Sequence, residues 1–129
     1  MGNSRYKFRA WDEEKKYMYP SVYFKQVFET KIWEDSGFDN LQIMQFTGLK
    51  DKHGQDVFEW DIVKPIQGMK GEHGVIVWLK DKAKFDINWR YAKNLGKYDY
   101  GIESVVDLEV IGNIYENPDL LTYWCWDKG

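Results

Sequence analysis

The sequence predicts a mainly β protein: a small barrel-like domain with SH3-like features that ends in a short irregular tail. Aromatic residues make up 18% of its 129 residues, and large rings suit the pleated, half-buried surface of a strand. Short segments of alternating apolar and polar residues are separated by turn residues. No segment carries a sustained apolar period of the kind that marks an amphipathic helix.

Strand signals run through the N-terminal half of the chain. Residues 5–11 alternate between basic and apolar side chains, and the charged stretch at 12–16 predicts a turn into a hairpin strand. Pro20 ends that strand, while residues 47–55 have the composition of turns. The expected strands are residues 5–11, 17–19 and 43–46, together with residues 22–33 as one strand or a pair of strands.

The C-terminal half carries stronger signals. Residues 75–79 form a continuous apolar run, which is typical of a strand buried on both faces. Gly112 predicts a bulge in the last strand, and the chain after Pro118 is expected to add one or two helical turns. We expect one domain over residues 1–121, followed by an aromatic extension over residues 122–129. The expected strands of this half are residues 57–63, 75–79, 84–91 and 108–115.

Cysteine usage and hydropathy indicate the compartment. Cys125 is the single cysteine, so no intrachain disulfide can form, and a reducing cytoplasm is expected. The first residues lack the apolar stretch of a signal peptide, and no run approaches the length of a membrane span. We therefore expect a cytoplasmic protein without membrane contact.

The net charge of −3 is distributed unevenly. Residues 1–64 carry a net charge of −1, residues 65–98 carry +4, and residues 99–129 carry −6. A mildly acidic chain with one basic segment is a poor non-specific nucleic-acid binder, although it can present a basic face.

The basic segment, residues 80–97, supports an alternative function as a nucleic-acid-binding module. Basic side chains can hold phosphates while aromatic faces stack on bases. The plainer interpretation is a strand with one solvated face and one core face. The candidate nucleic-acid-binding residues are Lys84, Trp89, Arg90 and Lys93.

No segment identifies a catalytic reaction. The regularly spaced glycines of residues 68–74 suggest a phosphate-binding loop, but a β run follows where a helix is required, and Glu72 is negative. A flexible hairpin loop explains these glycines better. The strands 61–64 and 74–77 on either side resemble the strand–loop–strand unit of SH3-like barrels, with an ordinary hairpin as the alternative.

Metal-binding and nucleophilic residues give equally weak signals. His53, Asp56, Glu59 and Asp61 are close in sequence, yet a turn followed by a strand separates their side chains. Cys125 has no neighbouring base to activate it. We expect no catalytic residue, no metal site and no cofactor.

The number of aromatic rings predicts self-association. Seven Trp, nine Tyr and seven Phe, at about 150–250 Å² each, exceed what the core of a small domain holds. Exposed apolar surface usually marks an interaction site. In the alternative, the C-terminal tail folds back onto its own barrel. The expected interface residues are Trp60, Tyr123, Trp124 and Trp126.

Four blocks of sequence carry a family resemblance. They are KFRAWD at 7–12, MQFTGLKDKHG at 44–54, VFEWDIV at 57–63 and EVIGNIYENPDLL at 109–121. Together they resemble the YopX family of phage and prophage proteins. Trp60 departs from the family, which usually has glycine there; a glycine that permits a tight turn would make Trp60 change the local geometry or add an exposed ring.

The resemblance implies a phage-derived, mostly β protein in the cytoplasm of a bacterial host cell. It implies no established activity and no catalytic residues. We therefore favour a non-enzymatic accessory protein that acts through protein contacts, either as a homo-oligomer or with a host or phage protein. The nucleic-acid-binding module is the alternative.

Overall fold

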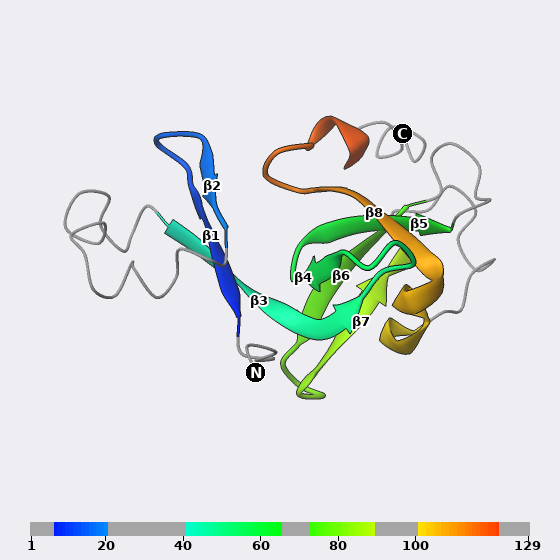
Figure 1. The fold of residues 1–129 in the computed structure, drawn as a ribbon. Coiled ribbons are helices and arrows are strands. Elements are labelled where there is room, and N and C mark those ends of the chain that lie inside the picture. Colours follow the sequence, from blue (N-terminus) through cyan, green and yellow to red (C-terminus); the bar gives the residue numbers. More distant parts are fainter. Residues whose placement is uncertain (1–6, 21–40, 66–72, 90–100, 122–129) are drawn as a thin grey trace, which may run out of the picture. The chain divides into compact units, whose positions relative to one another are not determined.

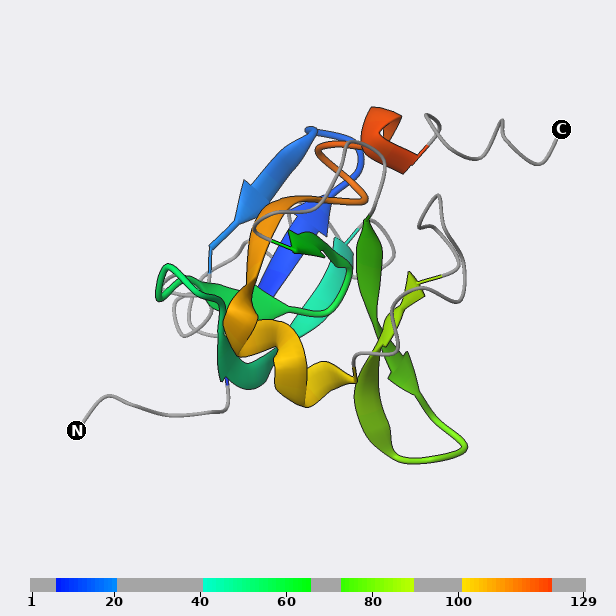
Figure 2. The same cartoon turned by 90° about the vertical axis from the view of Figure 1, so that its right-hand side faces the viewer.

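The computed structural model describes residues 7–20, 41–65, 73–89 and 101–121 (Figure 1 and Figure 2). Contacts divide the chain into two compact units, Met1–Phe46 and Thr47–Gly129. The predicted domain boundary at residue 121 falls where the described residues end, so it stays a prediction. The expected strand at 22–33 lies outside the described residues.

The first unit contains an antiparallel arrangement in which β1 lies between β2 and β3. Asp12 pairs with Tyr17 at the turn, and its Oδ1 atom accepts hydrogen bonds from the amides of Glu14 and Lys15, both at 3.0 Å. This side-chain cap of the turn confirms the predicted hairpin. The strands are β1 (Phe8–Asp12), β2 (Tyr17–Tyr19) and β3 (Leu41–Lys50).

β3 is longer than the predicted strand at 43–46, and residues 47–50, which the sequence assigned to a turn, belong to it. Two features let the strand continue into the second unit. The Thr47 hydroxyl donates to the carbonyl of Val57 at 2.8 Å, and Gly48 adopts a φ of +92° that glycine tolerates without strain. The turn itself begins at Asp51.

The predicted strand at 57–63 is also corrected, since it divides into β4 (Asp56–Phe58) and β5 (Asp61–Pro65). Trp60 interrupts it with a φ of +71°. The buried carboxylate of Asp61 accepts the amide of Phe58 at 2.8 Å, which closes the turn between the two strands.

The sheet of the second unit has the antiparallel order β7-β6-β5-β8 and curls around its core (Figure 1 and Figure 2). Opposite β8, Ile62 pairs with Gly112 but Val63 pairs with Val110, so Ile111 is an extra residue. This confirms the bulge predicted near Gly112. The remaining strands are β6 (Gly74–Leu79), β7 (Lys84–Asn88) and β8 (Leu108–Asn113).

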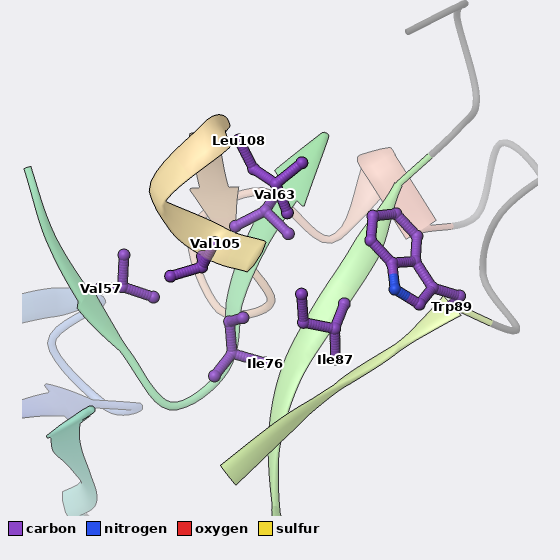
Figure 3. Close-up of a cluster of buried hydrophobic side chains, with 7 residues drawn as sticks. All are labelled: Val57, Val63, Ile76, Ile87, Trp89, Val105 and Leu108. Atoms are coloured by element: carbon purple, nitrogen blue, oxygen red, sulfur yellow. The ribbon is translucent and has the colours of Figure 1, made fainter. Parts of the chain in front are cut away.

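The core of this unit is a cluster of buried side chains between the sheet and a short 3-10 helix, η4 (Ile102–Asp107) (Figure 3). η4 was not predicted, because only Ile102 and Val105 face the core and so short an element carries no apolar period. A helical turn follows at 119–121, as predicted. The cluster consists of Val57, Val63, Ile76, Ile87, Trp89, Val105 and Leu108.

The sequence prediction of a mainly β protein is thus confirmed. The described strands form two sheets, and the curled second sheet has a barrel-like form. β5 and β6 pair antiparallel as the strand–loop–strand unit required. This arrangement is compatible with an SH3-like barrel, and that finer assignment stays a prediction.

Candidate interaction surface

The hairpin of β6 and β7 places aromatic side chains at the edge of the core. Leu79 pairs with Lys84, and the amide of Lys82 donates to the Leu79 carbonyl at 3.0 Å. Ala83 completes this tight turn with a φ of +50°. The backbone of the hairpin is therefore held by its own hydrogen bonds, so it presents its side chains in a fixed arrangement.

Trp78 is the most prominent of these side chains. Directly opposed residues of antiparallel strands share a face, so the pairs Ile76–Ile87 and Trp78–Phe85 lie on the core face. Ile76 and Ile87 are buried, but Trp78, further along, is 44% exposed. Its ring meets Phe85 edge to face, with centroids 4.9 Å apart, and Phe85 packs against the core cluster.

Exposed charges lie in the turn that follows this aromatic pair. Lys80, Lys82 and Lys84 are exposed around the turn together with Asp81, so the exposed charges sum to +2. None of these four side chains forms an ion pair within the described part of the chain. We name the group Trp78, Lys80, Lys82, Lys84 and Phe85 the aromatic–lysine hairpin.

The predicted nucleic-acid-binding residues differ in their exposure to solvent. Lys84 is exposed on the hairpin, as that function requires. Trp89 is only 9% exposed and belongs to the core cluster (Figure 3), so its ring offers no face to a base. Arg90 and Lys93 lie outside the described residues.

Sequence reasoning missed Trp78. Residues 75–79 were interpreted as a strand buried on both faces, and this is correct only for its first half. Val75 and Ile76 are buried, whereas Val77 and Leu79 are half-buried and Trp78 is exposed. The available signal was the basic turn immediately after residue 79, because a strand that enters a turn of charged residues leaves the core.

Trp60, one of the predicted interface residues, lies in the turn between β4 and β5. Its amide donates to the Ile76 carbonyl at 2.8 Å, and its carbonyl accepts the Ile114 amide at 3.1 Å. These bonds hold a left-handed conformation that costs a non-glycine residue about 1–2 kcal/mol. The half-buried ring is therefore carried on a strained backbone. Tyr123, Trp124 and Trp126 lie outside the described residues.

The strain at Trp60 can be measured with two variants. Trp60→Gly and Trp60→Ala both remove the ring, but only glycine relieves the left-handed conformation, so Trp60→Gly should be more stable by about 1 kcal/mol. Urea unfolding of both variants gives this difference. Equal stabilities would contradict the positive φ.

The residues weighed for metal binding are found in separate interactions. His53 Nε2 lies 3.2 Å from Glu109 Oε1. Asp56 Oδ1 lies 2.6 Å from Lys50 Nζ. The buried Asp61 caps the turn between β4 and β5. Glu109 also contacts Lys64 Nζ at 2.9 Å, and the hydrogen bonds from Lys64 and His53 lower the pKa of the Glu109 carboxyl. Within the described residues, no three His, Cys, Asp or Glu side chains are grouped to hold a metal ion.

His73, directly before β6, is a buried titratable group. Burial lowers the pKa of His73; its hydrogen bond to the Leu120 backbone opposes this shift, and the charge of Lys64 adds to it. The ring is therefore neutral at pH 7, and it links the start of β6 to the helical turn at 119–121. Below the ordinary histidine pKa of 6.5, His73 binds a proton more readily in the unfolded chain than in the folded chain. The stability of the fold therefore decreases as the pH is lowered.

We expect the free energy of unfolding to drop between pH 7.5 and pH 5.5 because of His73. His73→Gln keeps a side-chain amide donor for Leu120 and should lose this drop. His53→Gln is the matched control and should keep it. A His73→Gln variant with the wild-type pH dependence would contradict the assignment.

Comparisons with known proteins confirm the family resemblance. The family model described as YopX protein matches residues 7–122, while no curated protein matches the chain. Solved structures that it resembles include protein EF1440 from Enterococcus faecalis, with 24% identity and a TM-score of 0.60, covering 90% of this chain and 97% of EF1440. Protein yopX from Bacillus subtilis is 20% identical, with a TM-score of 0.44, covering 89% and 95% of the two chains. The likeness to EF1440 shows a shared fold.

No helix in the described part of the chain is long and apolar enough to cross a bilayer.

Proposed function

We propose that this chain, which belongs to the YopX family, is a non-catalytic accessory protein of a phage or prophage. It acts in the cytoplasm of the bacterial host by binding proteins, further copies of itself included. The observation that carries this proposal is the 44% exposed Trp78, braced against Phe85 on a hydrogen-bonded hairpin.

The residue types at the hairpin match those that are enriched at protein interfaces. Tryptophan is enriched among the residues that dominate binding energy, above all when it is pre-positioned and surrounded by polar groups. Trp78 has both properties, because Phe85 supports its ring and exposed lysines follow in the adjoining turn. Lys84, which pairs with Leu79, lies on the opposite face of the hairpin from the two rings. The arrangement favours a protein interface over a catalytic site, since a tryptophan and lysines that have no nucleophile–base pair beside them among the described residues supply contact rather than chemistry.

We include the predicted interface residues in the same proposal. We include Trp60 because its backbone is strained, and strained conformations persist where function requires them. Its amide bonds to Ile76, two residues before Trp78 on β6. We include Tyr123, Trp124 and Trp126 in the interface only because their side chains are aromatic.

Sedimentation equilibrium tests the proposal through the molar mass in solution. We expect wild type to exceed the 15.5 kDa monomer with increasing concentration. Trp78→Ala should weaken association by about 2 kcal/mol, or roughly 30-fold in dissociation constant. Tyr17→Ala, which removes a ring of similar exposure (46%) in the first unit, is the matched control. A chain ending at Leu121 reports the contribution of the tail.

Binding to another protein has a separate readout. A defined host or phage protein that is recovered from infected cells after nuclease treatment, and lost with Trp78→Ala, would support the proposal. A strictly monomeric wild type that also recovers no such protein would overturn it.

Nucleic-acid binding is the second candidate function, and the aromatic–lysine hairpin favours it because lysines flank an exposed ring. The small exposed charge of the hairpin limits the affinity, which should fall steeply with salt. Charge reversal of Lys84, Arg90 and Lys93 should abolish oligonucleotide binding measured by fluorescence titration. Unchanged affinity would remove this candidate.

A further inference from the structure

A second exposed patch lies on η4 and has the opposite charge. Ile102 and Val105 face the core, which leaves Glu103, Val106 and Asp107 exposed. Residues three apart in a 3-10 helix lie above one another, so Glu103 and Val106 share a face, and Asp107 adjoins them. Val106 is 48% exposed. We name these three residues the η4 patch.

The η4 patch carries two acidic side chains. Glu103 and Asp107 form no ion pair within the described residues, and no basic residue occurs between 101 and 121. By contrast, Glu109, on the neighbouring strand β8, forms an ion pair with Lys64 and lies within hydrogen-bond distance of His53. A partner that covers the η4 patch must therefore bring positive charge together with apolar surface for Val106.

The aromatic–lysine hairpin has these complementary properties. It presents the exposed Trp78 ring for an apolar contact and three lysines that lack ion-pair partners in the described part of the chain. Both surfaces belong to the second unit, and their inner residues Phe85 and Ile102 pack against the same core cluster. The hairpin turn and η4 both lie in the lower part of this unit (Figure 1 and Figure 2).

Resting on the proposed function, we infer that the partner of the aromatic–lysine hairpin is the η4 patch of a second copy. Two unlike patches on the same unit fit a two-fold arrangement, in which each copy offers its hairpin to the partner's η4 and receives the reverse contact. Opposite charges meet at both contacts, and the Trp78 ring of one copy covers Val106 of the other. Such charge pairing fixes the orientation of the two copies.

Charge exchange provides the test, with sedimentation equilibrium as the readout. Lys82→Glu with Lys84→Glu places carboxylates against Glu103 and Asp107, and it should weaken self-association about tenfold or more. Glu103→Lys with Asp107→Lys should weaken it similarly. Combining all four substitutions restores opposite charges at both contacts, so the dissociation constant should return to within about threefold of wild type.

Two controls make the outcomes decisive. The fourfold variant has the wild-type net charge, and Lys15→Glu with Lys52→Glu changes two exposed lysines outside both surfaces by the same charge, so it should leave association unchanged. Circular dichroism checks that each variant is folded. A strictly monomeric wild type overturns the inference, as does a fourfold variant that associates no better than the two double variants.

The inference and the proposed function can fail separately. If Trp78→Ala dissociates the protein but charge exchange has no effect, the hairpin binds another surface and only the inference is overturned. The same holds if wild type stays monomeric but recovers a defined protein that Trp78→Ala loses.

Discussion

Replacing Asp51 with alanine is expected to lower the free energy of unfolding by about 3 kcal/mol. Asp51 begins the turn between β3 and β4 and is 5% exposed. Its Oδ1 atom accepts the amides of His53 and Gln55, and its Oδ2 atom accepts the amide of Val110, all at 2.9 Å. One carboxylate therefore forms the turn and fastens it to β8.

The loss is large because alanine leaves these amides without their acceptor, at roughly 1–3 kcal/mol for each donor that water does not reach. Urea unfolding measures it. Asp51→Asn, which keeps one oxygen acceptor, should lose about half as much. A loss below 1 kcal/mol in Asp51→Ala would contradict the role of this carboxylate.

The Asp51 carboxylate should also make the stability of the protein depend on pH in acid. Burial by itself would raise the pKa of Asp51, but the hydrogen bonds from Val110, Gln55 and His53 outweigh burial and lower it below the ordinary value of 3.8. The stabilisation is therefore complete above that pH and is lost as the pH falls below it. Wild type should lose stability more steeply than Asp51→Asn in this range.

Gly74→Val is expected to cost about 3 kcal/mol for a different reason, which is overpacking. A Cβ atom at Gly74 would lie 2.5 Å from Ile87 Cγ2 and 3.0 Å from Trp89 Cε3. Both neighbours are buried members of the core cluster (Figure 3), so neither can move away without disturbing it.

A double-mutant cycle isolates this clash. Ile87→Ala removes the Cγ2 atom, so Gly74→Val should be less destabilising by about 1 kcal/mol in that background than in wild type. Gly54→Ala is a useful contrast, because Gly54 faces open space at a φ of +83° and loses only its backbone freedom, about 1 kcal/mol. Strict additivity at Gly74 and Ile87 would exclude the steric explanation.

Local patterns in the sequence predict much of the fold. The hairpin of β1 and β2 follows from alternation on both sides of a charged turn, and Asp12 caps that turn as a turn residue should. The β-bulge beside Gly112 also follows from one residue in a strand context. In both places, residues adjacent in sequence determine the outcome.

Features that depend on residues distant in sequence escape prediction. Trp60 sits within a continuous β pattern, and the break there is held by backbone bonds to Ile76 and Ile114. The sequence pattern favours burial for Trp78 and an accessible ring for Trp89, but the position of the core buries Trp89 and exposes Trp78. The charged turn after residue 79 indicates which end of β6 leaves the core, but the contact of Trp78 with Phe85 becomes visible only once the strands are paired.

Amide chemical shifts followed by NMR at increasing protein concentration test most directly whether the aromatic–lysine hairpin is a protein-binding surface. They report each position of the folded wild-type chain without any substitution. We expect concentration-dependent shifts at residues 78–85 and, where the partner copy docks, at residues 102–107, with residues 8–19 unchanged. Constant shifts across the hairpin, with movement confined to β1 and β2, would contradict it.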